Sequence, residues 1–215
     1  MVWLKQFLKS DLFSRKHALS PPALQQLSAR QGIAFKPAFR PLLETTAAST
    51  PENLKITGVG TTELPNVNAL TRYYMNTENL WIQVQTANSP CDPSGTMILF
   101  NRINRVALDN EADLRRISGP DSPIGKPTYS FNDKTYNRIW EGESGQKTLI
   151  PFKEHIELIE DEFDVYHRAM LYSHTTTSAQ RNEFLLFSIE DNTDGSISLS
   201  TSLGVSLYVS DFEYL

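Results

Sequence analysis

A regular alternation near the C-terminus, residues 196–209, constrains the fold more than any other stretch. Its odd positions, from Ile197 to Val209, are apolar or β-branched, and its even positions are serine, glycine or tyrosine. A period of two predicts a β-strand with one buried and one solvent-facing side. At about 3.3 Å per residue the stretch is too long for one flat strand, so we expect a bend or bulge at Gly204. We expect it to pair with residues 184–189, with its odd positions, Leu199 among them, facing inward.

Similar short strands recur from residue 54 onward. The patterns predict strands over 54–62, 70–75, 80–86, 96–103, 164–174 and 183–190, and a hairpin over 129–140 that turns at Asn132-Asp133. Asp109 is expected to cap a short helix that ends at Ile117, and the acid-rich residues 154–164 suit either a strand or a helix. The pattern favours an α+β, mainly β fold, as an antiparallel sandwich or a partly closed barrel with a few short helices.

Charge divides the chain into two parts. Residues 1–40 carry seven cations and one anion, a net charge of +6, so the rest carries −11 within a total of −5. An acidic body speaks against nucleic-acid binding. Residues 37–51 contain three prolines and a Thr/Ala/Ser run, which indicates a linker or surface loop. We therefore predict a basic helical N-terminal arm and linker over residues 1–50 and a β-rich body over residues 51–215.

The arm begins with an amphipathic pattern. Trp3, Leu4, Phe7 and Leu8 recur at helical spacing, which predicts a helix of about three turns over residues 1–13. These four side chains are candidate docking residues for a protein partner or an anionic membrane surface. A helix this short is marginal alone in water, so the alternative is that it packs on the protein's own body.

The expected location is the cytoplasm, with the inner membrane face as a possible site of peripheral attachment. No run reaches the roughly 18–20 apolar residues of a membrane span, and Lys5 and Lys9 interrupt what would be the core of a signal peptide. The single cysteine, Cys91, allows no internal disulfide, which is typical of a reducing compartment.

No catalytic, cofactor-binding or metal-ligating motif is predicted. A weaker candidate is a pocket lined by aromatic side chains of the predicted strands, namely Tyr73, Trp81, Tyr136 and Trp140. Aromatic residues supply much of any core, so ordinary core packing is the alternative for all four.

The histidines of the acidic third are the remaining chemical candidates. His155, His167 and His174 lie in or near the acid-rich segment 154–164 and could serve in a metal or acid–base site. However, His167 and His174 are an odd number of residues apart, so in one strand they face opposite sides of the sheet. A solvated acidic face is the alternative.

Four segments carry a family resemblance: Thr71-Arg-Tyr-Tyr-Met75, Tyr136-Asn-Arg-Ile-Trp140, His167-Arg-Ala-Met-Leu-Tyr172 and Glu183-Phe-Leu-Leu186. With them, residues 65–215 resemble the YjfK-like bacterial family of uncharacterised proteins, and the Trp-Leu-Lys start is also similar. The family has no assigned activity. Its members tend to be encoded near phage-shock-protein-A-like and glutathionylspermidine-synthase-like proteins, which implies a role near the cytoplasmic membrane or in envelope stress.

Three hypotheses remain open. The leading one is a non-enzymatic cytosolic adaptor that docks through its arm. The second is a barrel or sandwich that binds a small ligand. The third is an enzyme that uses the histidines and acids of residues 154–174.

Overall fold

The computed structural model describes residues 27–46, 53–63, 69–85, 96–140, 144–175, 181–192 and 195–215. Its first strands are β1 (Gly32–Phe35), β2 (Leu54–Glu63), β3 (Ala69–Met75), β4 (Leu80–Gln85), β5 (Thr96–Ala107) and β6 (Thr128–Phe131). The others are β7 (Lys134–Arg138), β8 (Ile150–Leu158), β9 (Glu162–Thr175), β10 (Asn182–Asp191), β11 (Ile197–Leu207) and β12 (Phe212–Tyr214). The short helices are η3 (Pro37–Phe39), α2 (Arg40–Thr45), α3 (Glu111–Ser118) and η4 (Val209–Asp211).

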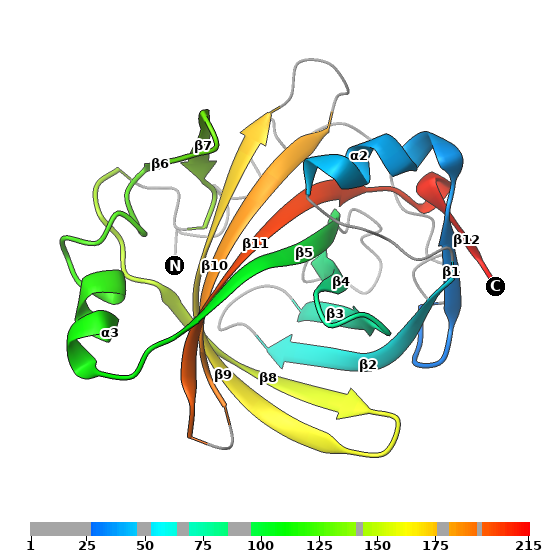
Figure 1. The fold of residues 1–215 in the computed structure, drawn as a ribbon, viewed down its shortest axis with the longest axis horizontal. Coiled ribbons are helices and arrows are strands. Elements are labelled where there is room, and N and C mark those ends of the chain that lie inside the picture. Colours follow the sequence, from blue (N-terminus) through cyan, green and yellow to red (C-terminus); the bar gives the residue numbers. More distant parts are fainter. Residues whose placement is uncertain are drawn as a thin grey trace.

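Eight antiparallel strands close into a barrel, in the order β2-β3-β4-β5-β11-β10-β9-β8, and β8 returns to pair with β2 (Figure 1). β1 and β12 extend the sheet beyond β2, and the β6–β7 hairpin pairs with the end of β9. Closure satisfies the backbone groups that an open sheet would leave at its edges. The predicted mainly β, antiparallel fold is confirmed, and the barrel closes completely.

Two apolar layers cover parts of the barrel's outer surface. β1, β12 and α2 enclose a cluster in which Phe39 and Leu43 pack with side chains of β4 and β5 such as Ile82 and Leu99. On β9 and β10, Tyr172 and Phe187 pack under the β6–β7 hairpin. Strands beneath these layers are buried on both faces, which is why their sequences are nearly continuous apolar runs.

β11 corrects the expectation of one buried and one wet face. It pairs with β10 over the predicted residues, but its serines are buried inside the barrel: Ser198, Ser200 and Ser202 are 5%, 3% and 1% exposed. Leu199 lies on the outer face and is only half-buried, so its predicted inward orientation is wrong. The register shift falls between Thr201 and Ser202 rather than at Gly204. Closure of the barrel encloses the serine face, and no local pattern reveals closure.

Several local predictions are confirmed. The turn of the β6–β7 hairpin is Asn132-Asp133, and both residues adopt positive φ angles, 48° and 59°, as a tight hairpin turn requires. The predicted helix is α3, although Asn110 rather than Asp109 caps it, accepting a hydrogen bond from the Asp113 N–H at 2.9 Å. The acid-rich segment 154–164 is the end of β8, a turn and the start of β9.

The N-terminal region is described only from Leu27 onward. The helix expected over residues 1–13, with Trp3, Leu4, Phe7 and Leu8, therefore lies outside the described residues, as does Cys91. Within the expected linker, residues 37–45 form η3 and α2, and Phe39 and Leu43 are buried in the core. Among the described residues, no helix has the length and apolar character that a membrane crossing requires.

Candidate functional site

The barrel interior holds a group of polar and charged side chains. Arg72 and Gln83 lie directly opposite each other on β3 and β4, while Glu154 and His167 come from β8 and β9. Alternate residues of a strand share a face, and the observed pairing places all four on the inner wall. Their exposed fractions are 3%, 1%, 0% and 5%. Charged side chains are almost never so fully buried unless they are paired, so their partners define the site.

Glu154 is the centre of this group. Its Oε2 accepts a hydrogen bond from Arg72 Nη1 at 2.7 Å, and its Oε1 accepts one from the Tyr74 hydroxyl at 2.7 Å. His167 Nε2 lies 2.9 Å from Oε2, an ion-pair distance with an unfavourable hydrogen-bond angle. Gly60 of β2 makes room for the carboxylate, because a Cβ there would lie 1.8 Å from Oε1. Four strands thus converge on a single carboxylate.

These contacts fix the charge states of the group. Burial alone would raise the pKa of Glu154, but the charge of Arg72 and the contacts of His167 and Tyr74 lower that pKa to about 2. Burial alone would lower the pKa of Arg72, but the neighbouring Glu154 carboxylate outweighs this effect and raises the pKa of the guanidinium. Burial and Glu154 together raise the pKa of Tyr74 well above its ordinary value. At neutral pH the interior therefore contains a carboxylate, a guanidinium and an uncharged phenol.

The polar group continues along the inner faces of β5, β10 and β11. His167 Nδ1 lies 3.0 Å from Ser188 Oγ, and Ser200 Oγ donates to Glu190 Oε1 at 2.6 Å. Arg105 donates to Ser198 Oγ at 2.9 Å, and its Nη2 lies 3.8 Å from Glu190 Oε2. The Arg105 side chain is 45% exposed, against 0% for Glu154. Polar groups thus extend from the buried carboxylate to solvent.

Some interior donors have no partner. Among the described residues, nothing accepts a hydrogen bond from Arg72 Nη2, Gln83 Nε2 or Trp81 Nε1, and all three atoms are buried. The Gln83 carbonyl is used, because Arg72 Nε donates to it at 3.1 Å, so only its amide nitrogen is left. Ser202 Oγ and Thr62 Oγ1 are also unpartnered in the described structure. A buried unpaired donor costs about 1–3 kcal/mol, so such groups normally meet a water or a ligand.

The charge states of Glu154 and Tyr74 do not suit general acid–base catalysis. A general acid or base works best when its pKa lies near the operating pH, whereas Glu154 is held as a carboxylate and Tyr74 as a phenol. The unpartnered atoms Arg72 Nη2, Gln83 Nε2 and Trp81 Nε1 are all donors, so they suit an acceptor oxygen. Trp81 stacks on Phe100 at 5.3 Å between ring centroids, which adds a flat apolar surface beside them.

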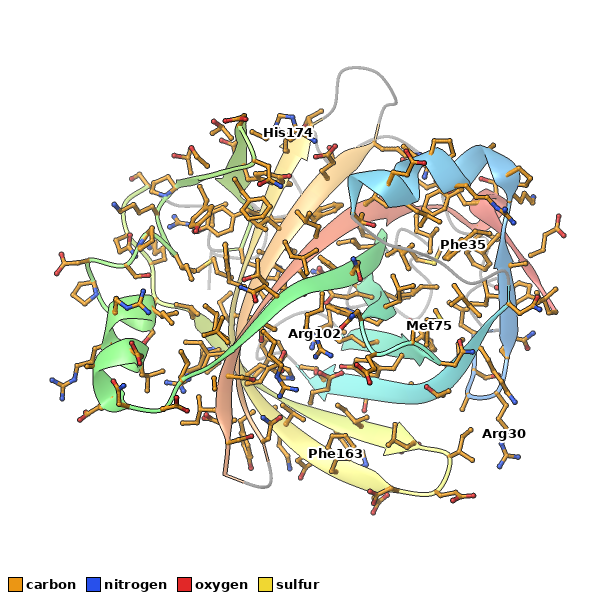
Figure 2. All side chains as sticks on the ribbon, viewed as in Figure 1. Arg30, Phe35, Met75, Arg102, Phe163 and His174 are labelled. Carbon is orange, nitrogen blue, oxygen red and sulfur yellow. The ribbon has the colours of Figure 1, made fainter. Side chains whose placement is uncertain are left out.

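A separate surface cavity of about 360 Å³ opens at the β3–β4 turn, where Thr77, Glu78, Asn79 and Leu80 line it with residues 101–103. Arg102, near the middle of the view in Figure 2, donates to the Glu78 carbonyl at 2.7 Å and to Asn79 Oδ1 at 3.4 Å. These contacts use Arg102 to hold the turn, so the cavity adds no free charged donor of its own.

The four aromatic residues proposed as pocket lining occupy different places. Trp81 faces the barrel interior, whereas Tyr73, which pairs with Ile82 across the sheet, packs with the outer cluster beneath β1 and β12. Tyr136 on β7 is 2% exposed and lies 3.3 Å from Glu183 Oε2. Trp140 packs edge-on against the inward-facing Phe152 at 6.3 Å. Of the four, Trp81 is the one whose ring nitrogen is buried without a hydrogen-bond partner among the described residues.

The three histidines are also separated. His167 faces inward, and His174 faces outward, where its Nδ1 lies 2.9 Å from the Thr135 carbonyl. Figure 2 shows His174 at the opposite end of β9 from Phe163. His155 is on the outer face of β8, with Nδ1 3.0 Å from Asp164 Oδ1. In the part of the chain that the structure describes, no three His, Cys, Asp or Glu residues are grouped so that they could hold a metal ion.

Sequence reasoning missed Arg72 and Gln83 and did not single out Glu154 within the acidic segment. In Thr71-Arg72-Tyr73-Tyr74 the arginine alternates with apolar neighbours, a pattern that predicts an arginine on the solvent-facing side of a strand. The available signal was Gly58-Val59-Gly60, since glycines inside a strand indicate the close approach of another group. Glu154 is that group at Gly60.

Comparison with known proteins gives a family and no function. No curated protein and no solved structure matches the chain. A family model described as a protein of unknown function, DUF2491, matches residues 39–213, which include every strand of the closed barrel and all of its polar interior. The expected membership in an uncharacterised family is therefore confirmed, and the chain belongs to the DUF2491 family.

Proposed function

We propose that this protein is a non-catalytic barrel that binds one small molecule in its interior through an acceptor oxygen. The observation that carries the proposal is the set of buried, unpartnered donors: Arg72 Nη2, Gln83 Nε2 and Trp81 Nε1. An eight-stranded barrel has an interior wide enough for packed side chains or for one small ligand.

The donors also indicate the chemistry of the ligand. A guanidinium nitrogen, an amide nitrogen and an indole nitrogen can only donate, so the bound group must accept, as a carbonyl or carboxylate oxygen does. The charge of Arg72 is already balanced by Glu154 at 2.7 Å, so a neutral carbonyl fits as well as a carboxylate. Beside these donors, the stacked rings of Trp81 and Phe100 favour a flat apolar body on the ligand.

A bound water is the competing occupant, since buried waters commonly satisfy two to four polar groups. The test replaces Trp81 with phenylalanine, which removes one unpartnered N–H and keeps a ring on Phe100. Trp140→Phe is the matched control, because Trp140 is also buried but contributes no atom to the set of buried, unpartnered donors. Trp81 Nε1 makes no hydrogen bond among the described residues, so the stability cost of Trp81→Phe should come from the lost volume and be about 1–3 kcal/mol.

Native mass spectrometry of the protein as purified from cells reads out the occupant. Wild type and Trp140→Phe should carry a small-molecule adduct, and Trp81→Phe should hold at least about fivefold less, the effect of one lost hydrogen bond. Wild type without an adduct, or equal adducts in the two variants, would contradict the proposal.

A second candidate function uses the arm. The net charge of +6 on residues 1–40 favours the adaptor hypothesis, in which Trp3, Leu4, Phe7 and Leu8 dock on a protein partner or on the inner face of the cytoplasmic membrane. Flotation with vesicles containing phosphatidylglycerol, with and without residues 1–19, tests the membrane form. Equal flotation of the two proteins would remove the arm from membrane binding.

A further inference from the structure

The outer face of the β8–β9 hairpin carries a dense acidic surface. Its exposed charges lie between residues 153 and 164: one lysine, Lys153, against five acids, Glu157, Glu160, Asp161, Glu162 and Asp164. Glu157 and Glu162 are direct cross-strand partners, an arrangement of like charges that weakens a sheet unless a cation lies nearby. His155 lies between them and Asp164, with Nε2 3.9 Å from a carboxylate oxygen of each glutamate.

Large apolar side chains are exposed at both ends of this acidic surface. Ile159, at the turn between the strands, is 42% exposed. Tyr166, on the same outer face as His155 and four residues beyond Glu162, is 56% exposed. Acids between two exposed apolar ends form a surface complementary to a cationic amphipathic helix. In Figure 1 the hairpin lies on the opposite side of the molecule from α2.

The N-terminal part of the chain leaves the barrel close to this hairpin. The Arg30 N–H donates to the Ile56 carbonyl at 2.8 Å, and Ile56 lies two residues before Gly58 on β2. Gly58 pairs with Leu158 at the end of β8. Two residues along a strand span about 7 Å, so Arg30 lies near the hairpin, three residues after Leu27, which is buried in the cluster of β1, β12 and α2. Figure 2 shows Arg30 at the side of the molecule that carries Phe163 of β9.

We propose that residues 1–26 of the same chain dock on the outer face of the β8–β9 hairpin. These residues carry Lys5, Lys9, Arg15 and Lys16 against Asp11, a net charge of +3, opposite an exposed net charge of −4 on residues 153–164. The helix predicted over residues 1–13 would be about 20 Å long, comparable with the strand length between Tyr166 and the turn. Its apolar residues Trp3, Phe7 and Leu8 would cover Ile159 and Tyr166. A partner of the arm would then have to displace it from this surface.

The test reverses two charges on the docking surface in the full chain. In Glu157→Lys/Glu162→Lys the surface is no longer complementary to the arm. Glu111→Lys/Asp113→Lys on α3 is the matched control, because Glu111 is exposed, Asp113 is half-buried and both lie on a different element. Both double variants change the total charge equally.

Two readouts report the position of the arm. Trypsin should cleave after Lys5, Lys9, Arg15 and Lys16 about tenfold faster in the hairpin variant than in the control. Each of the two reversed charges should weaken the docking of the arm a few-fold, because each removes a surface ion pair. Acrylamide quenching should increase in the hairpin variant alone. This quenching measures the accessibility of Trp3, since the other two tryptophans, Trp81 and Trp140, are only 8% and 4% exposed.

Equal cleavage and quenching in the two variants would overturn the proposal. Protection of the arm that appears only with phosphatidylglycerol vesicles would also overturn it, and would assign the arm to a membrane surface. Protection lost in 1 M salt without vesicles, in wild type and control alike, would support it, because salt screens exposed pairs.

Discussion

The buried ion pair inside the barrel makes the sharpest prediction of the structure. Glu154→Gln keeps the volume and an acceptor for Tyr74, but it removes the negative charge that faces Arg72 at 2.7 Å. The guanidinium would then be buried without a countercharge. Removing one partner of a buried pair typically costs about 3–5 kcal/mol, because the remaining charge is not solvated. That loss is a large part of the roughly 5–15 kcal/mol that stabilises an ordinary domain.

Urea unfolding at pH 7, followed by tryptophan fluorescence, measures the effect. We expect the unfolding midpoint of Glu154→Gln to fall without a change in slope. The double variant Arg72→Met/Glu154→Gln should be more stable than Glu154→Gln, since it leaves no buried charge. The control is Glu111→Gln on α3, whose pair with Arg115 is highly exposed and should contribute less than about 1 kcal/mol.

An unchanged free energy of unfolding in Glu154→Gln would refute the reasoning. It would mean that the Arg72 charge reaches water or another anion, although its exposed fraction is only 3%. A double variant less stable than Glu154→Gln would refute it as well, because removing an uncompensated charge should help.

Three further predictions concern single positions. Gly60→Ala should lose more stability than an ordinary strand substitution, since its Cβ would meet Glu154 Oε1 at 1.8 Å, and urea unfolding checks this. Asn110→Ala should cost about 1 kcal/mol by removing the cap of α3, which thermal unfolding measures. The pKa of Glu154 in the folded protein is about 2, below its ordinary 4.5. The stability that the ionised carboxylate gives the fold is therefore fully present above pH 4.5 and is lost as the pH falls from there through 2. The slope of stability against pH in that window should be smaller for Glu154→Gln; equal slopes would contradict the assignment.

The fold could be predicted from the sequence where the governing interactions are local. The hairpin turn at Asn132-Asp133 and the helix after Asn110 depend on turn and cap chemistry within a few residues. The alternation of β11 and its pairing with β10 follow from a period of two. These signals establish a mainly β, antiparallel chain.

Closure of the barrel could not be predicted in the same way. It depends on β8 pairing with β2, almost a hundred residues earlier in the chain, through the register Gly58↔Leu158. Closure turns the serine face of β11 inward and converts Arg72 from an apparent surface residue into a buried one. The candidate site escaped sequence reasoning for this reason, because its members come from β3, β4, β8 and β9 and share no motif.

The central claim is that the unpartnered donors of the barrel interior hold a small molecule. A high-resolution crystal structure of the protein as purified, without added ligand, tests this most directly. We predict density larger than a water, with an acceptor atom about 2.7–3.2 Å from Arg72 Nη2 and Gln83 Nε2, and its loss in Trp81→Phe. A single water bridging these nitrogens in wild type, unchanged in the variant, would contradict the account.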